Sequence, residues 1–368
     1  MHRFLFCILF CVVNSYLLVG QDLEEAKKKI AEGDFAGART ALTKILEVTP
    51  KHKAALNLRG KARAALADYY GAIADYTFAL EIDSTFAEAL NNRGEAKMNL
   101  ADDDGAIQDF TKAIKFKPDL SEAYTNRGLA KFNIDALQDA YFDFSKALEL
   151  GPADADKYFN RGVVKAELGE FVSAIDDYNK AIQLEKGDAS LYNYRGVAQY
   201  NAANFDGAIA DFDEAVKINA ADALTYENRA LAKTAKMDFK NALTDYNKAI
   251  ELTGDEAELY NLRGVVKFNL DDHEGAIADY TKAIALDNTN PTYFDNRALS
   301  KTEKGDYTGA VEDYTASIAL YPADAEAYYQ RAMLKITLNN KYDACLDLKT
   351  ADELGSTEAK AEIKKHCK

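Results

Sequence analysis

The sequence has no tryptophan, only five prolines and only four histidines, and each scarcity narrows the possible functions. Five prolines leave no room for long proline-rich linkers. The histidines after the first twenty residues, His52, His273 and His366, lie far apart, and no two have the spacing of metal ligands. Phosphate-binding glycine loops, His-Glu-x-x-His and nucleophile-elbow motifs are also missing. We therefore expect no enzyme activity, no cofactor and no metal.

Positive charge is scarce as well. The 60 acidic residues outnumber the 45 basic ones, which gives a formal net charge of −15. Nucleic acids and anionic membrane surfaces are bound through basic patches. We expect no nucleic-acid partner and no binding to an anionic membrane surface. The charge favours partners that are basic or neutral.

Long hydrophobic runs are absent except at the start of the chain. Residues 1–20, MHRFLFCILFCVVNSYLLVG, have a short basic beginning and then an uncharged apolar run, which is typical of a secretory signal peptide. Cleavage after Gly20 would leave Gln21 first; cleavage after Ser15 or an uncleaved signal anchor are the alternatives. No later run is long enough to cross a bilayer. We expect an exported protein, periplasmic or secreted. The lack of an Asn-x-Ser/Thr sequon after residue 20 favours a bacterial envelope.

Few cysteines remain after this segment. Cys7 and Cys11 lie within it, so the mature chain would keep only Cys345 and Cys367. A single pair in an oxidising compartment predicts a disulfide. Two free buried thiols are the alternative.

The dominant positive feature is a repeat of 34 residues. Arginine recurs at this spacing without insertion, at Arg59, Arg93, Arg127, Arg161, Arg195, Arg229, Arg263, Arg297 and Arg331. Glycine or alanine follows each arginine, and alanine and aromatic series keep the same step. A register that holds over nine positions indicates one structural unit used repeatedly.

Within a unit the apolar spacing is helical. Ala106, Phe110 and Ala113 lie four and three residues apart, and Leu90 and Gly94 share a face of the preceding helix. The polar stretch LADDDG between them predicts a turn, because it lacks the spacing of a helix-loop-helix calcium site. Each unit is therefore a predicted helix hairpin that must stack on its neighbours to bury its apolar face.

The period and these positions resemble the tetratricopeptide repeat. The unit 87–120 matches the family pattern with Leu90, Gly94, Ala106, Phe110, Ala113 and Pro118. With glycine as the eighth residue, ten units begin near residues 19, 53, 87, 121, 155, 189, 223, 257, 291 and 325. The resemblance implies an all-α solenoid of helix hairpins over residues 21–358, wound as a right-handed superhelix with the first helices lining a concave groove. Residues 359–368 are a predicted C-terminal capping helix.

An aspartate series accompanies the arginines. It comprises Asp75, Asp109, Asp143, Asp177, Asp211, Asp245, Asp279, Asp313 and Asp347, and unit one lacks both members, with Glu25 and Ala41. We interpret the two series as a structural ladder of partly buried ion pairs, formed within a unit or across to the next. A row of cations that binds phosphate or carboxylate ligands is the alternative, but the equal numbers of arginine and aspartate disfavour it.

A second polar series lies where the resemblance places the groove. Asparagine precedes the arginine at Asn92, Asn126, Asn160, Asn228 and Asn296, and Asn91, Asn193 and Asn261 lie one residue further back. An amide carries both a donor and an acceptor, so such a row can hold the backbone of an extended peptide. Local hydrogen bonding within the helices is the alternative.

These features predict a non-catalytic protein-interaction module that binds a protein or an extended peptide in its groove. One alternative is an assembly scaffold that uses the edges or the convex face. A cell-wall glycan binder, with tyrosine and asparagine contacting the sugar, is another.

The ladder interpretation predicts the cost of removing one arginine. If the pairs are buried, Arg195→Ala lowers the free energy of unfolding by about 3–5 kcal/mol, because an aspartate is left buried without its cation. Chemical denaturation measures the change. A loss below about 0.5 kcal/mol, the value of an exposed pair, would show that the ladder is solvated.

Overall fold

The computed structural model describes residues 20–367, and over this range every regular element is a helix. The all-α fold and its helix hairpins are therefore confirmed. The chain divides into two compact units, residues 1–186 and 187–368, which are described separately. The predicted signal peptide lies outside the described residues, apart from its last residue, Gly20.

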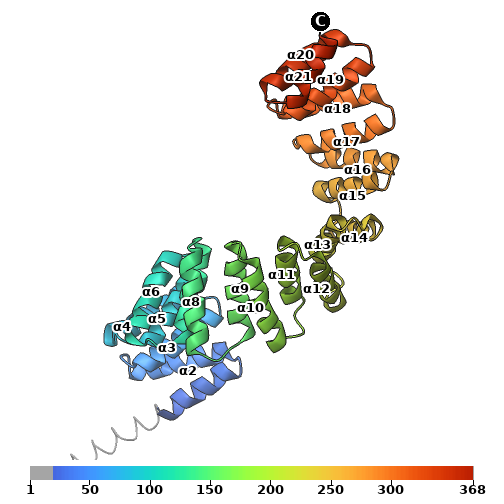
Figure 1. The fold of residues 1–368 in the computed structure, drawn as a ribbon. Coiled ribbons are helices and arrows are strands. Elements are labelled where there is room, and N and C mark those ends of the chain that lie inside the picture. The colour runs from blue at the N-terminus through green and yellow to red at the C-terminus, as the bar shows by residue number, and fades with distance from the viewer. Residues whose placement is uncertain (1–19, 368) are drawn as a thin grey trace, which may run out of the picture. The chain divides into compact units, whose positions relative to one another are not determined.

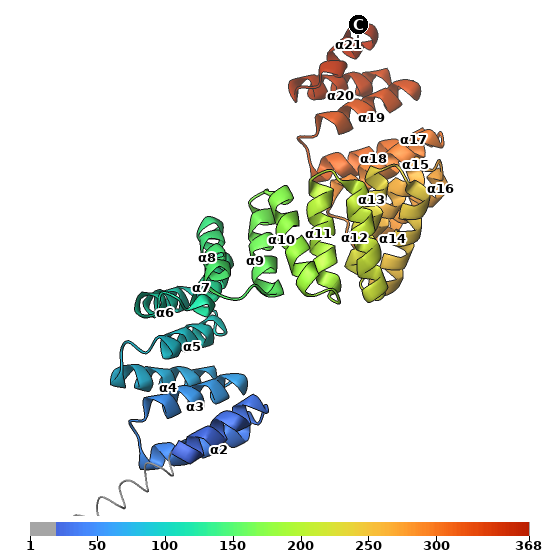
Figure 2. The same ribbon diagram turned by 60° about the horizontal axis from the view of Figure 1, so that its bottom comes forward.

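The first unit begins with a helical stretch at residues 20–31. Nine further helices follow it (Figure 1): α2 (Phe35–Val48), α3 (Lys53–Ala65), α4 (Tyr69–Ile82), α5 (Ala87–Met98), α6 (Asp103–Phe116), α7 (Ser121–Asn133), α8 (Leu137–Leu150), α9 (Ala155–Glu167) and α10 (Phe171–Leu184). The helices pair as hairpins, α3 with α4 and α5 with α6, and Figure 2 shows α3 and α4 stacked on α2.

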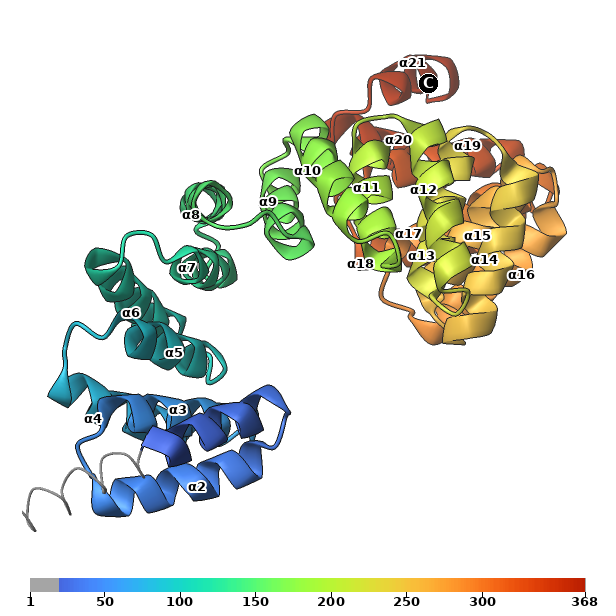
Figure 3. The ribbon, with the colours of Figure 1, turned by 90° about the horizontal axis from the view of Figure 1, so that it is seen from below.

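The second unit repeats this arrangement. Its helices are α11 (Ala189–Asn201), α12 (Phe205–Ile218), α13 (Ala223–Ala235), α14 (Phe239–Thr253), α15 (Ala257–Asn269), α16 (His273–Leu286), α17 (Pro291–Glu303), α18 (Tyr307–Leu320), α19 (Ala325–Thr337), α20 (Lys341–Glu353) and α21 (Thr357–His366). In each pair the earlier member is called the first helix and the later one the second helix. Figure 3 shows the hairpin of α5 and α6 in the first unit.

A small residue lets the two helices of a hairpin approach each other. The aromatic ring of the second helix lies against the glycine that follows the repeat arginine, so a Cβ added at Gly94 would stand 2.5 Å from the Phe110 ring. Phe110 is itself fully buried. A Cβ at this distance would require the ring to shift, so the position accepts only small residues: it is glycine in six repeats and alanine in three, at Ala230, Ala298 and Ala332.

The tight turn inside each hairpin has its own chemistry. One turn residue adopts a left-handed conformation, as at Ala67, Ala101 and Met237, with φ between 59° and 61°. The next residue then caps the second helix: the Asp102 carboxylate accepts a hydrogen bond of 3.0 Å from the Gly105 N–H. The acidic turn at residues 101–105 is thus a helix cap.

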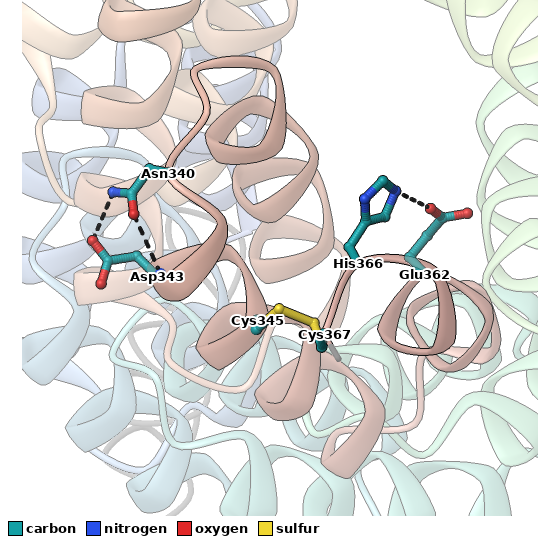
Figure 4. Close-up of a disulfide and its surroundings, with 6 residues drawn as sticks. All are labelled: Asn340, Asp343, Cys345, Glu362, His366 and Cys367. Carbon is teal, nitrogen blue, oxygen red and sulfur yellow. Dashed lines mark hydrogen bonds and ion pairs between the residues drawn. A yellow bond between two sulfur atoms is a disulfide. The ribbon is translucent and has the colours of Figure 1, made fainter.

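The C-terminal helix closes the second unit. α21 begins at Thr357, two residues before the predicted start, because Ser356 caps it by accepting from the Ala359 N–H. Figure 4 shows the Cys345–Cys367 disulfide, which joins α20 to the end of α21. The Glu362 carboxylate lies 3.3 Å from His366 Nε2 on the same helix.

The left-handed turn residues yield a prediction with a matched control. Ala65, the last residue of α3, and Ala67, in the turn that follows, are both exposed alanines. Only Ala67 has a positive φ, of 60°. Ala67→Gly should stabilise the protein by about 0.5–1 kcal/mol, because glycine adopts this conformation without strain. Ala65→Gly should destabilise it by about the same amount. Urea denaturation measures the change in the free energy of unfolding of each variant. Equal destabilisation by both would show that the positive φ of Ala67 causes no strain.

Candidate functional site

The repeat arginines and aspartates meet inside each hairpin. In the hairpin of α5 and α6, Arg93 Nε donates to Asp109 Oδ2 at 2.8 Å and Nη2 donates to Oδ1 at 2.7 Å. All nine repeats from residue 53 onward have this two-bond pair at a spacing of 16 residues. The pairing that the sequence left open is thus within the repeat.

The aspartates of these pairs are buried. Their side chains are 1–7% exposed and those of the arginines 12–19%, so the pairs belong to the interior. Lys97 adds a second cation, with Nζ 2.7 Å from Asp109 Oδ2. Burial acts to raise the pKa of Asp109, but the hydrogen bonds from Arg93 and Lys97 outweigh it and lower that pKa. The carboxylate therefore stays charged in the interior.

The same guanidinium also links successive repeats. Arg93 Nη1 donates to the Thr77 hydroxyl on α4, the second helix of the preceding repeat, at 3.2 Å. In the second unit, Arg229 Nη1 reaches Asp213 on α12 at 2.7 Å. The bond recurs in both units at a spacing of 16 residues. Because Nε, Nη1 and Nη2 of each such guanidinium already donate hydrogen bonds within the protein, the ladder is structural. Few N–H donors remain for an anionic ligand.

Aromatic rings lie beside most of these guanidinium groups. Seven rings approach within 5.1–5.9 Å of the arginine three residues later: Tyr124, Tyr158, Tyr192, Tyr226, Tyr260, Phe294 and Tyr328. Leu56 and Leu90 hold this place in the second and third repeats. The aromatic therefore contacts the ion pair as well as the core.

The first hairpin departs from this arrangement. Glu25 and Ala41 hold the places of the arginine and the aspartate, and Glu25 pairs instead with Lys29 at 3.5 Å. A hollow of about 560 Å³ borders Glu25, Lys29 and Ala41. The ladder therefore begins with the second repeat.

The asparagines of the two groove series contact one another. Asn126 Nδ2 donates to Asn91 Oδ1 at 3.1 Å, and the same bond across successive repeats joins Asn92 to Asn57 at 2.9 Å. In the second unit Asn228 donates to Asn193 at 3.2 Å and Asn296 to Asn261 at 2.9 Å. The predicted groove asparagines thus form inter-repeat pairs, which is more specific than the local bonding considered from sequence.

Sequence reasoning missed Asn57 and Glu95 in this network. Glu95 accepts from both Asn91, at 2.8 Å, and Asn126, at 2.5 Å. A spacing of 35 residues was the available signal, because each asparagine of the earlier position is followed 35 residues later by another. Asn160 has Thr125 at that spacing, and among the described residues it belongs to no such pair.

Carboxylates surround these amides on the first helices. Burial raises the pKa of Glu95. Burial, together with the nearby Glu256 and Glu258 carboxylates, raises the pKa of Glu227. Burial also raises the pKa of Asp295 to about 6. Within each compact unit, the acidic side chains on the first helices, with the asparagine pairs among them, are called the first-helix face of that unit.

Many carboxylates of the first-helix face form no ion pair within the described part of the chain, although the positive charge of Lys61 acts on Glu95. Carboxylates that form no ion pair there include Glu88, Glu95, Glu122, Asp156, Glu227, Glu256, Glu258, Asp295 and Glu326. The ladder aspartates, by contrast, all pair with arginine. Negative charge is thus neutralised inside the hairpins and left open on the first-helix face. Over residues 20–367, no helix combines the length and the apolar character that a membrane span requires.

Comparison with known proteins identifies the repeat. Two family models, both described as Tetratricopeptide repeat, match the chain, one at residues 87–120 and 257–290 and the other at residues 23–85. No curated protein sequence matches the chain.

One solved structure in particular shares the fold. The C-terminal part of a TPR repeat-containing protein from Cytophaga hutchinsonii matches with a TM-score of 0.56 and 19% identity, covering 64% of this chain and 97% of that one. A tetratricopeptide repeat protein from Parabacteroides merdae matches with a TM-score of 0.48 and 21% identity, covering 67% and 98%. Together with the hairpins and the family models, the first of these matches leads to one conclusion: the chain is a tetratricopeptide repeat protein.

Proposed function

We propose that the protein is a non-catalytic interaction protein that binds an extended, basic segment of a partner polypeptide along the first-helix face of a compact unit. Proteins of this repeat family serve in general as protein-interaction modules, and the segment and its location are the finer part of the proposal. The observation that carries it is the row of unpaired carboxylates among ordered amides on successive first helices.

The amides suit a peptide backbone. An asparagine side chain has two N–H donors and an acceptor oxygen, and Asn92, Asn228 and Asn296 each use one donor in their inter-repeat pair. The pairs hold the side chains in place before a ligand arrives, which lowers the ordering cost of binding. The remaining donor and acceptor capacity matches a peptide group without reading its side chain.

The carboxylates specify the charge of the partner. Glu227 is half-buried, and its burial, together with repulsion from Glu256 and Glu258, raises its pKa. A lysine or arginine from the partner would relieve that repulsion and favour the charged carboxylates. Binding should therefore strengthen as the pH rises through about 6, where Asp295 loses its proton.

An assembly scaffold is the second candidate, and α4 favours it. The outward residues Tyr70, Ala74, Phe78 and Ile82 form an uncharged stripe on this second helix, and Tyr70 is 78% exposed. The corresponding stripe on α6 contains Asp104 and Lys112. An exposed apolar helix face is typical of a surface that contacts another protein.

The first-helix proposal predicts a charge-specific loss of partners. The double variant Glu227→Gln and Glu258→Gln keeps the hydrogen-bonding shape but removes two charges. Partners captured from an envelope extract by the wild-type protein, and identified by mass spectrometry, should be lost with this variant and should carry basic segments. The matched control, Glu214→Gln with Glu251→Gln, removes two exposed charges from second helices and should retain them. Equal capture by both variants would reject the first-helix face and favour the scaffold.

We also propose that the protein is exported after cleavage behind Gly20. The composition of residues 1–20 and the bonding distance between Cys345 and Cys367 support this proposal. Mass spectrometry of the protein from its native source should find a chain that begins at Gln21. Alkylation without a reductant should leave Cys345 and Cys367 unmodified. A chain that retains Met1 and has two alkylated thiols would contradict both points.

A further inference from the structure

The second repeat, residues 53–86, lacks the ring that accompanies the arginine in most other repeats, as the third repeat also does at Leu90. Leu56 stands where seven other repeats have tyrosine or phenylalanine. A hollow of about 240 Å³ occupies this place. Its walls include Leu46, Pro50, Leu56, Arg59, Asp75 and Phe78, all within the first compact unit.

The register shows that the hollow corresponds to a ring position. In the eighth repeat, the Tyr260 ring lies 5.1 Å from the Arg263 guanidinium and 5.8 Å from Lys282 Nζ. Leu56, Arg59 and Phe78 are the residues at these three repeat positions in the second repeat, and all three line the hollow. The hollow between Arg59 and Phe78 therefore corresponds to the place that the Tyr260 ring occupies between Arg263 and Lys282.

The chemistry of the walls selects an aromatic occupant. Arg59 directs its Nε and Nη2 at Asp75, at 2.9 and 2.6 Å, and its Nη1 toward Thr43. These bonds lie in the guanidinium plane and leave a planar face that attracts the π-electrons of a ring. Leu46, Leu56 and Pro50 supply apolar contact, and Phe78, which is 59% exposed, stands at the edge where Lys282 and Lys112 stand in other repeats.

We propose that this hollow binds an aromatic side chain of a partner polypeptide, which takes the place of the missing tyrosine and stacks on Arg59. The site is separate from the first-helix face, because its walls come from α2, the loop that follows it, α3 and α4, and include none of the asparagine pairs. It gives the protein a second anchor point that selects tryptophan or tyrosine over an aliphatic residue.

The absence of tryptophan in this protein allows a direct test. A blocked pentapeptide with one tryptophan between glycines is titrated with the purified full chain, and tryptophan emission then reports the peptide alone. We expect saturable binding with a blue shift of the emission. In NMR spectra, contacts should appear between the ring protons and the Leu56 methyl groups. A peptide with leucine in place of tryptophan should compete about tenfold more weakly, because it lacks the cation–π contact.

Three variants locate the site. Leu56→Tyr fills the hollow with the ring that other repeats carry and should weaken binding at least about tenfold. Leu90→Tyr makes the same change in the third repeat and should leave binding unchanged. Phe78→Ala removes only an exposed side chain at the edge of the hollow, so it serves if Leu56→Tyr loses its helical circular dichroism, and it should weaken binding several-fold because the bound ring loses an apolar contact.

Each remaining outcome overturns the proposal. Binding that survives Leu56→Tyr, or Phe78→Ala where that variant is needed, would place the peptide elsewhere. The absence of saturable binding, or equal binding of the leucine peptide, would remove the aromatic selectivity. Self-association in sedimentation experiments that Leu56→Tyr abolishes would make a second copy of the chain the occupant.

Discussion

The buried arginine–aspartate pair is the interaction on which the array depends. One guanidinium holds the two helices of its own hairpin together and also reaches the second helix of the preceding repeat. A buried carboxylate is costly without a cation, so each aspartate fixes the position of its arginine and of the helix that carries it. The coupling is therefore between nearest neighbours, as in other solenoids, but it is carried by charge as well as by apolar contact.

Much of the fold was predictable from the sequence, because the residues that recur every 34 positions are ones whose size is fixed by packing. Gly94 must be small because the Phe110 ring lies against it, so both keep their place in the sequence of the unit. The helices and hairpins follow from this pattern. The left-handed alanines of the turns were not predictable, since alanine does not favour a positive φ. The start of α21 depends on the Ser356 cap.

The candidate site was less predictable, because its contacts cross repeats. The arginine and aspartate series were visible, but only the structure distinguishes a partner 16 residues ahead from one in the next unit. The sequence alone shows two series of asparagines and does not indicate that they pair with each other. Their pairing at 35 residues, and the part that Glu95 plays in it, depends on how neighbouring first helices stack. The hollow at Leu56 was not predictable for the same reason: the sequence shows leucine at the ring position in two repeats, Leu56 and Leu90, but does not show where a hollow forms beside the ion pair.

The two ends of the described chain are stabilised by different interactions, so local unfolding should start at one end rather than at both. The first hairpin has no arginine–aspartate pair, whereas the last helix is tied covalently to its neighbour. In a repeat array the least anchored end opens first, and opening then spreads to the adjacent repeat. Amide hydrogens of residues 20–48 should exchange before those of α20. The hairpin that opens most easily also forms one wall of the hollow beside Arg59. A ligand bound there would act as a clamp that suppresses fraying of the array.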